Sequence, residues 1–168
     1  YIYAYATETF TYFDLTTPNN VRITSIVNHI LQDKDGNLWF STNGQGLFRY
    51  NLSKNYLEQY EFTSAFGIVA STMADSDNQI WALTNQGESG VYKLNKAENK
   101  FEPFGLLYNA GNHHSQALAM LEDSEQTLWL GTWECGLQKI DKYTRQTTTY
   151  LHPTDGKGVT HIHSLMEY

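Results

Sequence analysis

Apolar and polar residues alternate along short stretches of this chain. In one such stretch Leu47, Arg49 and Asn51 alternate with Phe48 and Tyr50, and turn residues lie on either side. A period of two places successive side chains on opposite faces of the backbone, as in a β-strand, whereas a helix repeats every 3.6 residues. The pattern therefore predicts an all-β chain built from short antiparallel strands.

The same local motif occurs three times. In each copy an Asp lies six residues before a Trp, a Thr lies three residues after it, and a Gly then begins a Gly-apolar-x-basic-apolar-Asn/Asp stretch. The tryptophans are 42 and then 48 residues apart, which is typical of a radially repeated β-unit. The repeated positions are Asp33, Asp75 and Asp123, then Trp39, Trp81 and Trp129, then Gly46, Gly90 and Gly136.

These repeated tryptophans are expected to pack between neighbouring sheets. A ligand site need not occur three times in one chain, so repetition of the indole indicates a structural role. The residue before each Trp is also apolar and is expected to share this packing: Leu38, Ile80 and Leu128.

Each repeat is predicted to form one four-stranded antiparallel blade, with strands A to D running from the inside outward. In the first repeat strand A covers 26–32, B covers 38–42, C covers 47–51 and D ends near Tyr60. The predicted units are strands C and D of a preceding blade in 1–15, complete blades in 21–62, 66–105 and 115–151, and the first strand of a following blade in 159–168.

The predicted fold is thus a partial β-propeller, an arc of about three complete blades and two partial ones. The two ends together would supply strands A, C and D of a blade, but not the strand B that carries the tryptophan. Propellers protect their sheet edges by closing into a ring. We therefore expect the remainder of a larger propeller to be a partner of this arc.

Charge and composition exclude several classes of function. The formal net charge is −7 with only 11 Lys and Arg, which argues against binding to nucleic acid. No apolar run approaches the roughly 20 residues that span a bilayer. The single Cys135 permits no internal disulfide. No residue pattern calls for a cofactor.

The repeats resemble the two-component regulator propeller family. The resemblance rests on Asp-x-Asp-Gly-x-Leu-Trp-x-x-Thr followed by Gly-Leu-x-Arg-Tyr-Asn in the first repeat, and on Gly131-Thr132-Trp133 in the third. The second repeat departs from it, with Asn78 where the first has Gly36.

The resemblance implies a periplasmic sensor region of a Bacteroidetes hybrid two-component system, anchored in the inner membrane as part of a histidine kinase. Its expected ligand is an oligosaccharide, and the signal would pass to a kinase outside this chain. Such a chain would not itself be an enzyme. The parent protein would be able to act as a homodimer.

Loop lengths indicate which face binds the ligand. The distance from the turn Asp to Trp is six residues in all repeats, but Trp to Gly is 7, 9 and 7. The variable B–C and D–A connections emerge on one face of a propeller, and variable loops on a rigid scaffold commonly carry binding sites. The predicted ligand-binding residues on that face are Asn43, Gln45, Asn85, Gln86, Glu88, Asn112, His113, His114, Trp133, Glu134 and His161.

The chemistry of this set suits a neutral polyol. Amides and carboxylates bind hydroxyl pairs, and an indole offers a flat surface to a sugar ring. For Trp133 the alternative is packing or loop support. A zinc site is one alternative for His113 and His114, together with His161 and His163, but these residues do not supply a full ligand set. Residues 33–37 resemble the first half of a calcium-binding loop, but the remaining ligands are absent. No metal is therefore predicted.

Two other functions remain open. A propeller lyase or hydrolase would need acid-base groups near the central axis, where strand A offers His29, Ser71, Ala119 and Ser164. A protein-interaction or dimerisation propeller would use exposed aromatics such as those at Tyr1, Tyr3 and Tyr5.

Overall fold

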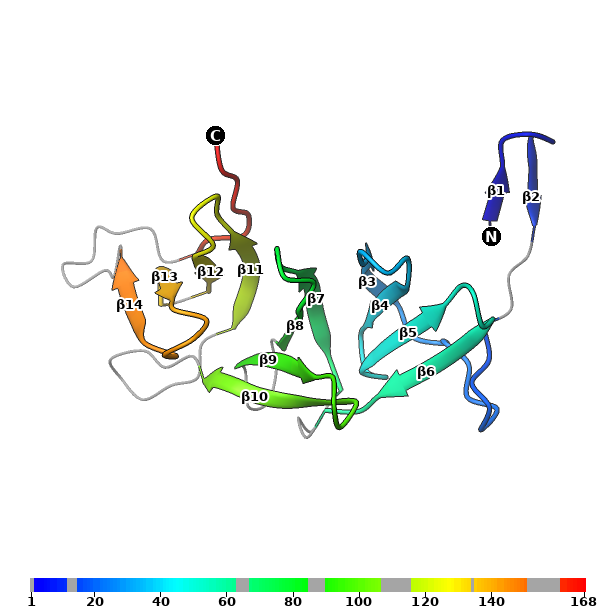
Figure 1. Ribbon diagram of the computed structural model, residues 1–168, viewed down its shortest axis with the longest axis horizontal. Helices are drawn as coiled ribbons and strands as arrows, with labels where there is room; N and C mark the ends of the chain where they lie inside the picture. The colour runs from blue at the N-terminus through cyan, green and yellow to red at the C-terminus, as the bar shows by residue number, and fades with distance from the viewer. Residues whose placement is uncertain are drawn as a thin grey trace.

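The computed structural model describes residues 2–11, 15–62, 67–84, 90–106, 116–133, 135–150 and 161–168. The described residues form strands, turns and extended segments, and none of them is helical. Three four-stranded antiparallel sheets follow one another along the chain, and a two-stranded sheet precedes them (Figure 1). The predicted all-β fold, a partial propeller of four-stranded antiparallel blades, is confirmed.

The strands follow chain order within each sheet. Blade one consists of β3 (Val27–Gln32), β4 (Leu38–Thr42), β5 (Leu47–Asn51) and β6 (Tyr56–Tyr60). Blade two consists of β7 (Val69–Ala74), β8 (Ile80–Thr84), β9 (Gly90–Asn95) and β10 (Lys100–Leu106). Blade three consists of β11 (Ala117–Glu122), β12 (Leu128–Thr132), β13 (Leu137–Ile140) and β14 (Thr147–Tyr150). The first strands β3, β7 and β11 contact one another in sequence, which places them on the inner side of the arc.

The two ends of the chain differ from complete blades. Strands β1 (Ile2–Ala4) and β2 (Thr9–Thr11) pair only with each other among the described strands. Residues 161–168 contain no strand, because no described strand pairs with them. The segment nevertheless makes a contact that resembles one made by β11. Glu122 of β11 accepts bonds from Ser76 in blade two, and Glu167 accepts bonds from Ser124 in blade three.

The core lies between the blades. Trp39 of blade one is 1% exposed and packs with Ile80, Ala82, Tyr92 and Leu94 of blade two. Trp81 of blade two is 0% exposed, and the cluster around it includes Leu128, Leu130 and Ile140 of blade three. Each interface thus combines the tryptophan of one blade with the apolar face of the next.

A hydrogen bond explains the six-residue spacing between Asp and Trp. The indole Nε1 donates to the carboxylate Oδ2 at 2.8 Å for Trp39 and Asp33, 3.0 Å for Trp81 and Asp75, and 2.7 Å for Trp129 and Asp123. The other oxygen of each aspartate accepts two backbone N–H groups of the A–B turn. The motif therefore closes the turn and fixes the indole in the interface. Because the Asp33 carboxylate accepts N–H groups of its own turn, residues 33–37 form a hydrogen-bonded turn.

The A–B turn also explains why the second repeat tolerates its departure from the motif. Gly36 has a φ of +80°, in the left-handed region. Asn78, which stands near the same point of the turn in blade two, has a φ of +57°. Asparagine is one of the few residues other than glycine that adopts this region at low cost.

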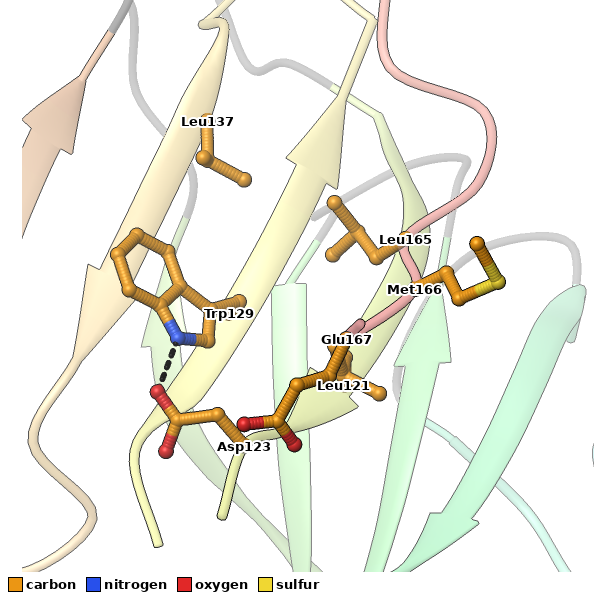
Figure 2. A pocket seen from close by; sticks show the side chains of 7 residues that line it. All are labelled: Leu121, Asp123, Trp129, Leu137, Leu165, Met166 and Glu167. Atoms are coloured by element: carbon orange, nitrogen blue, oxygen red, sulfur yellow. Dashed lines mark hydrogen bonds between the residues drawn. The ribbon is translucent and has the colours of Figure 1, made fainter. Parts of the chain in front are cut away.

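The third tryptophan lies in a more open setting. Trp129 keeps its bond to Asp123 but is only partly buried, and it lines a cavity of about 290 Å³. Figure 2 shows that Leu165, Met166 and Glu167 of the C-terminal segment line the other side of this cavity. Trp39 and Trp81 pack against the next blade on the same side of their own blades. The cavity beside Trp129 lies at the equivalent position of blade three, so its apolar lining is explained by blade packing.

Candidate functional site

The structure describes four of the predicted ligand-binding residues: Asn43, Gln45, Trp133 and His161. The other predicted residues lie outside the described part of the chain; these are Asn85, Gln86, Glu88, Asn112, His113, His114 and Glu134. The candidate site is therefore built from the B–C loops of blades one and three and from the C-terminal segment.

Trp133 is the most exposed indole of the chain that the structure describes. Trp133 directly follows the last residue of β12, and it is 40% exposed, whereas Trp39 and Trp81 are fully buried. Two imidazoles stand nearly perpendicular to it: the ring centroid of His161 is 4.1 Å away at 85°, and that of His163 is 5.6 Å away at 88°. The three rings form one cluster at the end of blade three.

Glycine and backbone bonds bring the histidines to Trp133. A Cβ on Gly131 would lie 2.5 Å from the carbonyl oxygen of Ile162, so only glycine permits this close approach. The N–H of Ile162 donates to the carbonyl of Thr132 at 3.0 Å. Because Ile162 is held in this way, the residues on either side of it, His161 and His163, lie beside the indole.

The B–C loops are closed by the threonine of the motif. The Thr42 hydroxyl donates to the carbonyl of Gly46 at 2.7 Å, and that of Thr132 donates to Gly136 at 2.8 Å. Both threonines are fully buried. The loop in blade three is thus fixed at its base, which gives Trp133 a rigid support.

Gln45 has a structural role in the described contacts. Its Oε1 accepts bonds from the backbone N–H groups of Thr24 and Ser25 at 2.7 and 2.8 Å, and its Nε2 donates to the carbonyl of Arg22 at 3.0 Å. The side chain therefore ties the segment before β3 to blade one. Asn43, in the same loop, is exposed.

The inner strands place His29, Ser71 and Ala119 at matching positions, each just after a register shift in its A–B pair. Burial lowers the pKa of His29 below its ordinary value of 6.5, which favours the neutral imidazole. Its Nδ1 lies 3.4 Å from the hydroxyl of Thr72. Among the described residues no group of three or more His, Cys, Asp or Glu side chains is placed to hold a metal ion.

One charged cluster was not expected from the sequence. Lys142, in the C–D turn of blade three, has a side chain that is only 4% exposed, and its Nζ lies 2.7 Å from Glu122, 3.0 Å from Asp77 and 3.8 Å from Asp75. Burial opposes the charge of Lys142, but the hydrogen bonds to Glu122 and Asp77 outweigh burial and raise its pKa. Asp77 and Lys142 are 65 residues apart, so no local pattern could have revealed their pairing.

The fold and this arrangement of blades define a β-propeller. The family model described as Two component regulator propeller matches residues 19–44, which include strands β3 and β4 with Trp39. The resemblance of the repeats to that family is therefore confirmed. No curated protein matches the chain at a significant level.

Solved structures with the same fold include two extracellular domains of hybrid two-component systems and a lyase. The extracellular domains of two hybrid two-component systems of B. thetaiotaomicron match 89% and 87% of the chain, with 20% and 19% identity and TM-scores of 0.60 and 0.63. Virginiamycin B lyase of Staphylococcus aureus matches 86% of the chain at 16% identity with a TM-score of 0.65. The chain spans only 23% and 21% of the two extracellular domains and 50% of the lyase. At such low identities these matches establish the shared propeller fold.

Within the described ranges, no helix is long and apolar enough to cross a bilayer.

Proposed function

We propose that this chain is a ligand-sensing part of the periplasmic region of a hybrid two-component sensor, and that it recognises an oligosaccharide without catalysing a reaction. The match of 19–44 to the two-component regulator propeller and the fold shared with two extracellular sensor domains support this proposal. In this proposal a kinase elsewhere in the parent protein receives the signal, and the rest of the propeller and a second copy of the parent protein are its partners.

The exposed face of Trp133 is the observation that carries the proposal. Buried tryptophans in the other two complete repeats serve the blade interfaces, but Trp133 adds a fourth indole that remains 40% exposed on the face of the variable loops. An indole presents a flat apolar surface to the C–H side of a sugar ring. The neighbouring imidazoles of His161 and His163 can donate and accept hydrogen bonds with hydroxyl groups.

The same contacts also describe the alternative role of Trp133 as a support for the C-terminal segment. The two roles make different predictions for binding and stability, because a support residue affects folding while a ligand platform affects affinity. Trp133→Ala separates them when both properties are measured on one protein.

The test is calorimetric titration of the purified chain with plant, microbial and host oligosaccharides. Tyr143→Ala is the matched control, because Tyr143 is 74% exposed in a C–D turn on the opposite face. We expect saturable binding to one class of oligosaccharide, at least a tenfold loss of affinity in Trp133→Ala, and unchanged affinity in Tyr143→Ala. Absence of binding by the folded chain across the panel would refute the proposal, and equal affinity of Trp133→Ala and wild type would remove Trp133 from the site.

A further inference from the structure

A second cavity lies between blades two and three, on the side of the C–D turns. It has a volume of about 350 Å³, and three basic side chains line it: Lys93 of β9, Lys96 in the turn that follows, and Arg145 in the C–D turn of blade three. The chain as a whole carries a net charge of −7 and only 11 basic residues. Three of them therefore gather at one cavity of an acidic protein.

The equivalent position between blades one and two is filled by a carboxylate. Arg49 donates to Glu58 at 2.6 Å, the hydroxyl of Tyr60 donates to the same carboxylate oxygen at 2.9 Å, and Asn99 donates to the other oxygen. Burial raises the pKa of Tyr60 well above its ordinary value, so the phenol remains a neutral donor. Three side chains from two blades thus surround one carboxylate.

The repeats assign an equivalent to each member of this network. Lys93 faces Glu102 across β9 and β10 as Arg49 faces Glu58 across β5 and β6. Phe104 packs against Trp81 as Tyr60 packs against Trp39, with centroids 4.8 and 5.6 Å apart. In the C–D turns Asn99 has a φ of +51° and Arg145 a φ of +63°, each four residues after the Asn or Asp that begins the turn.

The carboxylate of blade two does not take the central place. Glu102 Oε1 instead accepts a bond from Asn95 Nδ2 at 3.0 Å and lies 3.9 Å from Lys100 Nζ. Tyr60 is replaced by Phe104, which has no hydroxyl, and Asn99 is replaced by the cation of Arg145. The cavity therefore keeps a cation and an aromatic ring at the positions of Arg49 and Tyr60, and it gains the cation of Arg145. Glu102 also lines the cavity, but its carboxylate forms no ion pair with Lys93 or Arg145 among the described residues.

The cations also lack carboxylate partners within the described part of the chain. Lys93 Nζ lies over the rings of Trp81 and Phe104 at 5.2 and 5.9 Å, and Arg145 Cζ lies over Phe104 at 5.1 Å. Lys93, Lys96 and Arg145 have no described Asp or Glu oxygen within 4 Å, whereas Arg49 is paired with Glu58. Two cations, Lys93 and Arg145, thus flank the ring of Phe104.

We infer that this cavity binds a small carboxylate-bearing ligand, whose carboxylate takes the place that Glu58 occupies between blades one and two. Arg145 presents a planar fork suited to a carboxylate, and Lys93 and Lys96 add point charges. The site lies on the side of the C–D turns and is separate from Trp133. It would therefore give the protein a second ligand, or anchor an acidic unit of a longer one.

The probes are trigalacturonate and a neutral galactose trisaccharide, with a short glutamate-rich peptide to distinguish acidic sugars from acidic proteins. Titration of the purified chain at low ionic strength should show saturable binding of trigalacturonate and none of the neutral sugar. Arg145→Gln and Lys93→Met should each weaken binding by roughly tenfold to a hundredfold, the value of a charge-assisted hydrogen bond. Lys54→Met is the matched control, because Lys54 is an exposed cation in the C–D turn of blade one.

A double variant tests the comparison between the two blade interfaces and keeps both aromatic and polar side chains in place. Phe104→Tyr with Arg145→Asn restores the hydroxyl and the amide of the first interface, with Lys93 still in the place of Arg49, so Glu102 can take the central place. We expect loss of trigalacturonate binding with an unchanged or higher melting temperature. Tighter binding of the peptide than of trigalacturonate would keep the carboxylate site but assign it to acidic protein segments.

Equal affinities of Arg145→Gln and Lys54→Met would overturn the proposal, and so would absence of binding to every carboxylate probe. Trp133→Ala should leave trigalacturonate affinity at this cavity unchanged. Failure of the Trp133 site and failure of this cavity are therefore separate results.

Discussion

Replacement of Lys142 by methionine tests the charged cluster between blades two and three. The Lys142 side chain is 4% exposed and faces Asp75, Asp77 and Glu122. Methionine keeps most of the apolar stem but leaves the carboxylates without their cation. Removing one partner of a buried ion pair costs about 3–5 kcal/mol. Since Asp77 is 62% exposed and can be hydrated, we expect the lower end of that range, about 3 kcal/mol.

Thermal unfolding followed by circular dichroism measures this loss. For a chain of this size a destabilisation of about 3 kcal/mol lowers the melting temperature by roughly 6–12 °C. Lys100→Met is the matched control, because Lys100 also pairs with two carboxylates, Glu98 and Glu102, but its side chain is 58% exposed. Exposed pairs contribute little, so this control should unfold at nearly the wild-type temperature.

The pH dependence gives an independent check. The pKa of Lys142 is higher in the folded chain than its ordinary value of 10.5, so the folded state holds the proton more tightly than the unfolded state. The stabilisation is therefore fully present below pH 10.5 and declines as pH rises through the folded pKa. The difference between wild type and Lys142→Met should be constant from neutral to mildly alkaline pH and then shrink. An unchanged melting temperature in Lys142→Met, or a difference that grows at alkaline pH, would refute the reasoning.

Two further predictions concern the blade interfaces. Trp81→Ala should lower the free energy of unfolding by about 3–5 kcal/mol, because it truncates a fully buried core residue. Trp129→Ala should cost less, because its indole is only partly buried. Chemical denaturation of both variants measures the two losses, and equal losses would contradict the difference in packing. Gly131→Ala should displace the segment of Ile162, because the added Cβ would lie 2.5 Å from its carbonyl oxygen. Faster amide exchange of Ile162 would report that displacement, and unchanged exchange would argue against the tight contact.

The parts of the fold that repeat could be predicted from the sequence. The spacing of Asp33 and Trp39 recurs because one carboxylate closes a turn and binds an indole within six residues, which is local information. The alternation in 47–51 likewise follows from the two faces of one strand. Contacts between blades could not be predicted in this way. Lys142 and Asp77 meet only because the third blade packs beside the second.

The candidate site was predicted in part. Variable loop lengths placed Trp133 and His161 on the same face, and the structure brings their rings to 4.1 Å. The role of Gln45 depends on the backbone of 22–25 and was visible only in three dimensions. The basic cavity was missed because its signal is a difference between repeats. An alignment of the repeats, which places Arg145 at the position of Asn99, would have shown the additional cation.

The pairing of each tryptophan with the next blade makes this protein a chain of nearest-neighbour couplings. Blade two has a partner on both sides, and all five residues of β8 are buried, whereas the four residues of β14 are exposed. In such a system cooperativity is transmitted through interfaces and local opening begins at the outermost strands. Amide exchange should therefore be slowest in β8 and fastest in β14. A ligand that bridges two blades would strengthen a single coupling and slow exchange mainly on its two sides.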